Sequence, residues 1–559
     1  MLEINRNRIS KRQYIVFLVF IIAFLFLSLK ILQIQHFDYK KLSVMANSQY
    51  SYSENTTDAR FLLFDCTGKE LLNYNKKYYA VISPNIFRND NKDLKSEDIL
   101  TLVYTLRNYN RDYDISKSGE LNSSQKLYYE VDESTYEKLR KLNGIKGFYT
   151  YEYDPVDKSG VWSIENLLIN PNRTKDSSKK SKDSIEMQLY EKTKDNKIPQ
   201  IVFKKDVNNK IIGKYKNTQD SNVNVRLTLN KKVEDSIKTI LNNSYNRKYN
   251  QIGVVLMEAN TGAIRAIVQK DDTKPNVNLG VATNHGFFPG SIFKVLVEES
   301  GLDKNKISVL DKFVSRGLYE EEEEEKTNKG ATFTPKEALI ASNNDVFAQI
   351  GDKIGFQDIY NNLKAHGLLK KVLNFDQEKE GELEMKNPKI SDGTLGLTSI
   401  GQNIRITPIE AISIPNTVVN SGVYVKPHII DAYVDNNNRI IEKENYNSSQ
   451  IIKQSTADEM KSQMIDVVKK GTGTFAYLDD VEIGGKTGTT QRMELSEKTN
   501  SVVEHSDGWF VGFFNLKGKN YSMVVFVEDI NKNTQSGGNT AAPIFKQIVL
   551  QLKNSMENN

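Results

Sequence analysis

The longest apolar run of the chain lies near its N-terminus. Residues 15–29 read IVFLVFIIAFLFLSL without a charge, and apolar positions continue past Lys30 to Ile34. As a helix, Tyr14–Leu32 would span roughly 28 Å, close to the bilayer core of roughly 30 Å. A buried core helix rarely runs this long without a polar face. The pattern therefore predicts a transmembrane anchor over residues 14–36.

The charges around this run predict its orientation. Lys30 lies near the far end, where its stem can snorkel to the interface. No A-x-A-like cleavage site follows, which favours an uncleaved anchor over a signal peptide. By the positive-inside rule, residues 1–13 are expected in the cytoplasm and the rest of the chain outside. The basic residues that precede the run are Arg6, Arg8, Lys11 and Arg12.

Residues 37–222 are polar, rich in Tyr and Lys, and carry only short apolar alternations. A strand over 61–64 is expected to run into a turn at Gly68. Residues 173–183 (RTKDSSKKSKD) are typical of a charged loop. The pattern also predicts short helices at 100–106 and 136–142, and a hairpin of 201–203 with 210–212.

The apolar pattern changes from about residue 223. A strand-like segment, 225–229, leads into an amphipathic helix over 232–241, and 253–258 with 263–268 reads as a hairpin around a Gly-containing turn. Strand-like runs return near the C-terminus. These are 508–514 and 521–527, followed by a helix over 541–552. Strands at both ends, with a helical region at 280–475 between them, predict an α+β domain with an antiparallel sheet and a helical cluster.

Composition narrows the function classes. The 559 residues carry 76 Lys+Arg against 71 Asp+Glu, a net charge of +5, which argues against a nucleic-acid binder. The 24 Phe and 27 Tyr argue against a disordered chain. The lone Cys66 excludes an intramolecular disulfide and any cysteine-based metal cluster.

Other polar features predict no chemistry. The six acids of Glu320–Glu325 are expected to form a solvated loop, because like charges repel into water. The five histidines lie without ligand spacing, so we expect no metal and no cofactor. They are His36, His285, His366, His428 and His505.

Ser291 and Lys294 form an S-x-x-K motif that follows Pro289-Gly290. On a helix, positions i and i+3 share a face, so the lysine amine can reach the serine hydroxyl. A serine needs a base before it becomes a nucleophile, and a lysine can be that base when its pKa is lowered. Chance alone gives roughly four or five such matches in a chain this long, so the motif is weak by itself.

Two further motifs follow. Ser342-Asn343-Asn344 is an S-x-N motif, which taken alone reads as a helix N-cap. Lys486-Thr487-Gly488-Thr489 is expected by chance only about 0.01 times, which makes it the strong signal. It is not a phosphate loop, because that motif would need a glycine where Val481 stands.

The ordered set S-x-x-K, S-x-N and K-T-G is the signature of penicillin-binding proteins and related β-lactamases. The chain resembles a class B penicillin-binding protein, a monofunctional peptidoglycan D,D-transpeptidase. Similarity extends through 400–410, Gly471–Thr474, Trp509–Gly512 and Leu227–Asn230. A looser likeness covers 60–68 and 184–190. The resemblance implies a dimerisation or pedestal domain over 37–222 and a transpeptidase domain with the β-lactamase-like fold over 223–559.

The resemblance also implies roles for the motif residues. Ser291 would attack the D-Ala-D-Ala carbonyl of a peptidoglycan stem peptide, and Lys294 would be its base. The acyl group would then pass to an amine of a neighbouring stem peptide, and β-lactams would acylate the same serine. The remaining implied assignments are a proton relay at Ser342, hydrogen bonding at Asn344, positive charge at Lys486, substrate binding at Thr487, Gly488 and Thr489, and an oxyanion hole from the Ser291 and Thr489 N–H groups.

Two alternatives remain open at this point. One is a hydrolase, either a D,D-carboxypeptidase or a β-lactamase, although the nearest match to a deacylating E-x-x-L-N motif, at 382–387, does not fit. The other is a β-lactam sensor or a scaffold. No E-D-x-x-F-x-x-H glycosyltransferase motif occurs in 37–222, which argues against a bifunctional class A protein. The resemblance also implies a polytopic glycosyltransferase as partner.

Overall fold

The computed structural model of the chain describes residues 2–38, 50–92, 96–116, 121, 125–320, 328–496 and 501–557. These residues divide into two compact units. Unit 1 contains residues 1–58, 74–156 and 197–219, and unit 2 contains residues 59–73, 157–196 and 220–559.

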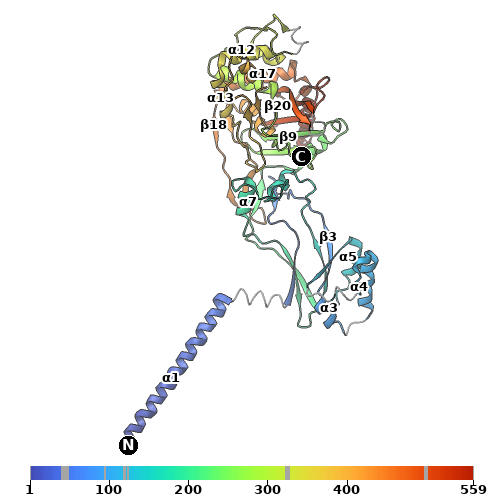
Figure 1. The fold of residues 1–559 in the computed structure, drawn as a ribbon, viewed down its shortest axis with the longest axis vertical. Helices are drawn as coiled ribbons and strands as arrows, with labels where there is room; N and C mark the ends of the chain where they lie inside the picture. The colour runs from blue at the N-terminus through green and yellow to red at the C-terminus, as the bar shows by residue number, and fades with distance from the viewer. Residues whose placement is uncertain are drawn as a thin grey trace. The chain divides into compact units, whose positions relative to one another are not determined.

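The first helix of unit 1, α1 (Leu2–Gln33), carries the predicted anchor (Figure 1). Residues 12–36 are long and apolar enough to cross a membrane, and none of the span is buried within the protein. A short π-helix, η1 (Ile34–Asp38), follows it.

The rest of unit 1 is built on two three-stranded sheets, in the orders β1-β6-β7 and β4-β3-β5. Tyrosine rings line these sheets, and Tyr52 stacks on Tyr149 at 4.8 Å between centroids. The predicted hairpin is confirmed, because β6 and β7 pair antiparallel around a turn at Asn209. The elements are β1 (Ser51–Asn55), β3 (Lys77–Ile82), α3 (Pro84–Asp90), α4 (Ser96–Tyr109), η2 (Arg111–Tyr113), β4 (Leu127–Val131), α5 (Glu133–Leu139), β5 (Phe148–Tyr153), β6 (Gln200–Lys205) and β7 (Ile211–Asn217).

Unit 2 contains a five-stranded antiparallel sheet in the order β10-β9-β21-β20-β19. The strands come from both ends of the sequence and the helices from the middle, which is the predicted α+β arrangement. The strands are β9 (Gln251–Glu258), β10 (Ile264–Gln269), β19 (Ile483–Ser496), β20 (Ser501–Leu516) and β21 (Lys519–Glu528). β19 is an edge strand, so one of its sides is not paired within the sheet.

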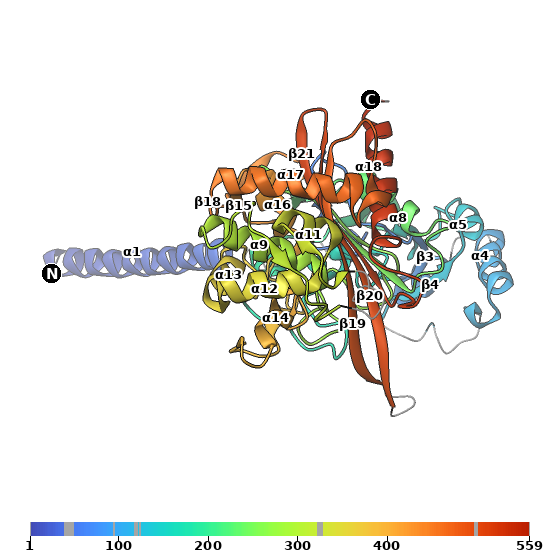
Figure 2. The same cartoon turned by 90° about the horizontal axis from the view of Figure 1, so that it is seen from above.

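Helices cover both faces of this sheet. Figure 2 shows α8 (Lys231–Leu241) and α18 (Ala541–Glu557) on one side and the cluster around α9 (Lys294–Asp303) on the other. The core under α8 and α18 contains Phe510, Met523 and Phe545, each fully buried. The other helices are α11 (Pro335–Ala341), α12 (Asn344–Ile354), α13 (Phe356–Ala365), α14 (Thr394–Ser399), α15 (Pro408–Ala411), α16 (Ser413–Val419) and α17 (Gln454–Lys470), with the 3₁₀ turns η4 (Gly290–Phe293) and η5 (Thr474–Ala476).

Two segments from the predicted N-terminal region belong to unit 2. Residues 59–73 supply β2 (Leu63–Phe64), which pairs in parallel with β8 (Asn224–Leu227). Residues 157–196 supply α6 (Ile164–Ile169) and α7 (Ile185–Lys192). The remaining short strands are β11 (Phe313–Val314), β12 (Thr332–Phe333), β13 (Glu382–Leu383), β14 (Ile404–Arg405), β15 (Val423–Val425), β16 (Ile430–Val434), β17 (Ile440–Lys443) and β18 (Ser448–Gln450).

Most predicted elements occur within one to four residues of their expected bounds. The helix expected at 232–241 is α8, and the hairpin of 253–258 with 263–268 is β9 with β10. The expected strand 225–229 ends at Leu227, and the helix expected at 136–142 begins and ends three residues earlier. An aspartate explains the latter shift: Asp132 caps α5 by accepting a hydrogen bond from Thr135 N at 2.8 Å.

Candidate active site

Ser291 and Lys294 lie on either side of a change in helix type. Ser291 is half-buried within η4, and Lys294 begins α9 and is fully buried. The sequence predicted one helix for both residues. A 3₁₀ turn brings positions i and i+3 into line more closely than an α-helix does, so the two residues still share a face.

The side-chain nitrogen of Lys294 is held by Ser342 and Asn344 of the S-x-N motif. Its Nζ donates to the carbonyl oxygen of Ser342 at 2.5 Å and to Asn344 Oδ1 at 2.6 Å. It also lies 3.3 Å from Ser342 Oγ. These two neutral acceptors fix the position of the amine.

The S-x-N motif forms the junction of two helices. Ser342 ends α11 in the left-handed conformation, with φ of 62°, a conformation that costs a non-glycine residue roughly 1–2 kcal/mol. Asn343 is the N-cap of α12, and its Oδ1 accepts from Val346 N at 2.8 Å. The N-cap interpretation therefore holds for Asn343, while Ser342 and Asn344 face Lys294.

Lys486 approaches the same serine from the edge strand β19. Its Nζ donates to Ser342 Oγ at 3.0 Å and to the Thr487 carbonyl oxygen at 3.0 Å. Ser342 Oγ thus lies between two lysine amines. Burial lowers the pKa of Lys486 well below its ordinary value, and the nearby positive charge of Lys294 lowers it further.

The threonines of the K-T-G motif differ in exposure. Thr487 is buried, and its Oγ1 lies 2.7 Å from Thr472 Oγ1 in the Gly471–Thr474 segment. Thr489 is exposed, and its Oγ1 accepts from Gly537 N at 3.1 Å. The Thr487 hydroxyl is therefore buried against the Gly471–Thr474 segment, while Thr489 is exposed.

The turn that carries Ser291, η4, packs closely against the backbone of β19. Gly290 has φ of +54°, and a Cβ there would lie 2.8 Å from the carbonyl oxygen of Thr489. A Cβ at Gly488 would lie 2.7 Å from the carbonyl oxygen of Pro289. Both positions therefore require glycine, and the turn that carries Ser291 lies beside Thr489. Trp509 Nε1 also donates a hydrogen bond to Phe288 O, just before this turn, at 3.0 Å.

A residue that the sequence assigned to a solvated loop belongs to this site. Glu320 Oε1 accepts from Asn344 N at 2.7 Å and from Asp345 N at 3.3 Å, and so caps the N-terminus of α12. Asn344 Nδ2 donates to the carbonyl oxygen of the preceding Tyr319 at 2.9 Å. For Glu320 the solvated-loop prediction is wrong, because unpaired helix N–H groups attract a carboxylate. Residues 321–325 of the acidic run lie outside the described residues.

The structure thus brings together residues that are far apart in the sequence. Ser291, Lys294, Ser342, Asn344 and Lys486 converge between η4, α12 and β19 within unit 2. Thr487, Gly488 and Thr489 continue along the same strand edge. Helical spacing predicted that Lys294 approaches Ser291, and the family resemblance implied the rest of this grouping.

Comparisons with known proteins agree with this geometry. A family model described as the penicillin binding protein transpeptidase domain matches residues 252–550, more than half of the chain. The chain belongs to this family. Its relatives place it among the class B proteins, the monofunctional D,D-transpeptidases.

Two relatives and one solved structure illustrate the range of similarity. Stage V sporulation protein D of Bacillus subtilis is 23% identical, over 98% of this chain and 86% of the relative. A peptidoglycan D,D-transpeptidase FtsI homolog of Mesostigma viride is 24% identical, over 54% of this chain and 56% of its own length. A peptidoglycan synthetase from Bifidobacterium adolescentis shares the fold, with a TM-score of 0.61, 18% identity, and coverage of 91% of this chain and 97% of that one.

Proposed function

We propose that the protein is a serine-type D,D-transpeptidase that cross-links peptidoglycan stem peptides through an acyl-enzyme on Ser291. The observation that carries this proposal is the hydrogen-bonded chain from Lys294 through Ser342 to Lys486, which lies beside the serine turn at the edge of β19. β-Lactams would acylate the same serine, because their ring carbonyl resembles the scissile D-Ala-D-Ala carbonyl.

Acylation begins with proton transfer to the Lys294 amine. The Ser291 oxygen attacks the carbonyl carbon between the two D-alanines, and the Ser291 proton passes to Lys294 Nζ. The oxyanion accepts hydrogen bonds from the backbone N–H groups of Ser291 and Thr489. The contact of Gly290 with Thr489 supports this pairing, because it sets the two backbone segments side by side.

Collapse of the oxyanion breaks the carbon–nitrogen bond, and D-Ala leaves. Ser342 gives its proton to the departing amine and regains one from a lysine beside it. A hydroxyl accepts two hydrogen bonds and donates one. Since both lysine amines donate to Ser342 Oγ, its own proton is directed to a third partner. The lowered pKa of Lys486 makes this exchange of protons possible.

Substrate binding is supported by the open edge of β19. An unpaired strand edge offers N–H and C=O groups to an extended peptide, which adds as a further strand. In this arrangement Thr487 and Thr489 bind the terminal carboxylate, with Lys486 providing positive charge nearby. Gly488 carries no side chain and lets the backbone segments approach closely.

The anchor completes the proposal. Residues 14–36 would hold the protein in the bacterial cell membrane as a single-pass segment, with residues 1–13 in the cytoplasm and residues 37–559 outside. The apolar helix at 12–36 and the basic cluster before it support this topology. The polytopic glycosyltransferase partner stays a prediction from the resemblance.

The test uses the full chain in detergent with a stem peptide ending in D-Ala-D-Ala and a D-amino acid as acceptor amine. Mass spectrometry should detect D-Ala release and an acyl product that contains the acceptor. Ser291→Ala should abolish both products, while the exposed control Ser455→Ala should keep them. Hydrolysed peptide alone, at every acceptor concentration, would support the carboxypeptidase alternative instead.

A further inference from the structure

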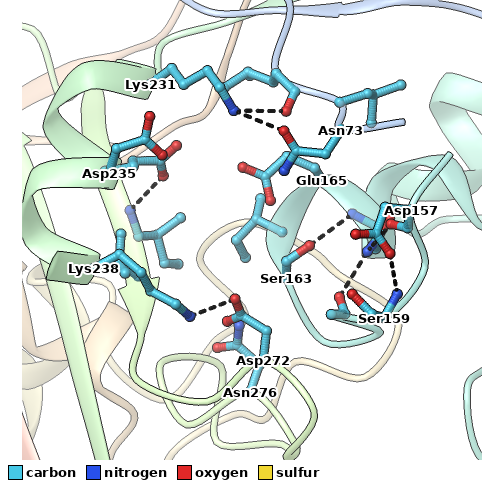
Figure 3. A pocket seen from close by; sticks show the side chains of 18 residues that line it. Asn73, Asp157, Ser159, Ser163, Glu165, Lys231, Asp235, Lys238, Asp272 and Asn276 are labelled. Carbon is cyan, nitrogen blue, oxygen red and sulfur yellow. Dashed lines mark hydrogen bonds and ion pairs between the residues drawn. The ribbon is translucent and has the colours of Figure 1, made fainter. Parts of the chain in front are cut away.

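Unit 2 contains a second site of buried charge, away from Ser291. A partly open cavity of about 260 Å³ is lined by residues of α8 and β10, residues 71–73, the 157–166 segment at the start of α6, and the 272–276 loop (Figure 3). All of these segments belong to unit 2. We call it the Glu165–Glu234 cavity, after the two carboxyl groups in its wall.

The two carboxyls come from different elements. Glu165 lies on α6, and Figure 3 shows its carboxyl group pointing into the cavity. Glu234 lies on α8 and is 9% exposed. Within the described part of the chain, one hydrogen bond reaches the Glu234 carboxyl, from Ile267 N to Oε1 at 3.3 Å. Its second oxygen is therefore left without a hydrogen-bond donor at the cavity wall.

The lysines of the cavity are committed to other partners. Lys238 Nζ donates to Asp272 Oδ2 at 2.6 Å and to Gln269 O at 2.7 Å. Lys231 Nζ donates to Leu71 O at 3.3 Å and to Asn73 Oδ1 at 3.5 Å. Among the described residues it makes no ion pair within 4.0 Å with either cavity glutamate. The wall thus carries more carboxyl groups than it has cations to pair with them.

Burial and nearby charges disfavour the ionised carboxylates of Glu165 and Glu234. Burial raises the pKa of Glu234 well above its ordinary value, and the carboxyl of Glu165 raises it further. Burial likewise raises the pKa of Glu165, with a smaller contribution from Asp272. Lys231 opposes the shift at both residues, and exposed Asp235 adds to it at Glu234. A cation between the carboxyls would relieve this cost.

We propose that the Glu165–Glu234 cavity binds the primary ammonium group of a small alkyl amine. A primary ammonium is a cation with three N–H donors, and the two carboxyl groups offer it acceptors, of which Glu234 has one oxygen without a donor. A metal ion fits less well, because the described residues contain no group of three or more His, Cys, Asp or Glu side chains able to hold one. The volume accommodates an alkyl chain behind the ammonium. This site is independent of the transpeptidase proposal.

The ammonium could belong to a free diamine or to a side-chain amine, and two probes separate these sources. Calorimetric titration uses the full chain in detergent, first acylated with a β-lactam or carrying Ser291→Ala, so that Ser291 chemistry contributes no heat. The probes are 1,5-diaminopentane and Nα-acetyl-lysine methyl ester. Binding of both indicates a single-ammonium site, and binding of the diamine alone indicates a free diamine as the occupant. An uncharged amide with the same alkyl chain as the diamine should not bind.

The double variant Glu165→Gln/Glu234→Gln keeps the shape of the wall and removes its charge. It should weaken amine binding about tenfold or more, the loss expected when one charge-assisted hydrogen bond disappears. The exposed pair Glu191→Gln/Asp458→Asn is the matched control and should bind as the unmodified chain does. Affinity should fall as the pH is lowered, because protonation of the pair removes the anion.

Three results would overturn the proposal. They are no saturable binding of either probe at mildly alkaline pH, equal binding by the double variant, and affinity that does not change with pH. Circular dichroism shows whether the double variant is folded. If it is not, the single variant Glu234→Gln and the pH dependence of the unmodified chain decide.

Discussion

Unit 2 buries like charges side by side in two places, and the two places are completed differently. At the active site, the Lys294 and Lys486 amines are both fully buried and share Ser342 Oγ as an acceptor. In the Glu165–Glu234 cavity, the carboxyls face a space instead of a shared hydroxyl. The lysines are arranged for proton transfer within the chain, whereas the glutamates are arranged for a cation from outside it.

The largest expected effect is on the acylation rate, when one of the two active-site lysines is replaced. Lys294→Met keeps the length of the side chain and removes the base. We expect acylation by a labelled penicillin to slow by about 10²- to 10⁴-fold, the usual contribution of a general base. Lys304→Met, just beyond the end of α9, is the control and should leave the rate unchanged. A loss below about tenfold would mean that Lys294 is not the base.

A smaller effect comes from the charge cap on α12. Glu320→Ala removes the acceptor of the Asn344 N–H, so Asn344 should hold Lys294 less well and acylation should slow about tenfold. Glu320→Gln retains an acceptor oxygen and should restore most of the rate. Glu337→Ala removes the equivalent cap of α11 and should lower stability without changing the rate. Equal rate losses in the two alanine variants would contradict a specific role for Glu320.

The two sites should also differ in how pH affects stability. An unfolded lysine has an ordinary pKa near 10.5, and the folded pKa of Lys486 is lower. At pH values between the folded and unfolded pKa, the unfolded state binds more protons than the folded state. Lys486 therefore makes the free energy of unfolding rise with pH in this range. Urea unfolding across alkaline pH should show a shallower rise in Lys486→Met than in the exposed control Lys469→Met. Identical slopes would contradict the lowered pKa.

The smallest expected effect concerns Glu234, which makes stability fall rather than rise with pH. The folded pKa of Glu234 lies above its ordinary value of 4.5, so the folded state binds the extra proton and stability falls as pH rises through that window. Glu234→Gln removes this penalty and should raise Tm by about 2 °C at neutral pH, and by less in acid. A lower Tm at neutral pH would mean that the carboxyl stabilises the folded chain.

Sequence motifs predicted the chemistry of one site and nothing of the other. Ser291, Lys294 and Lys486 belong to short motifs whose spacing is recognisable without a structure. Glu320 lies in a run of like charges, and its role depends on an α12 N-terminus that only folding places beside it. Glu165 and Glu234 are 69 positions apart and face the same cavity only because the 157–196 segment folds into unit 2.

The elements were predicted better than their grouping. Short apolar runs around a Gly-containing turn located β9 and β10, which are almost wholly buried, and the amphipathic pattern located α8. No local pattern shows that β2 pairs with β8 across about 160 residues, since that pairing depends on long-range contacts. The two N-terminal segments of unit 2, residues 59–73 and 157–196, therefore precede the predicted boundary at residue 222.

The central claim is a stable acyl-enzyme on Ser291, and intact-mass spectrometry of the full chain with a β-lactam tests it most directly. The predicted result is a mass increase of one β-lactam per chain that persists after free drug is removed and is absent in Ser291→Ala. A mass increase in Ser291→Ala would contradict the nucleophile. Return of the unmodified mass within seconds would contradict a transpeptidase and indicate a β-lactam hydrolase.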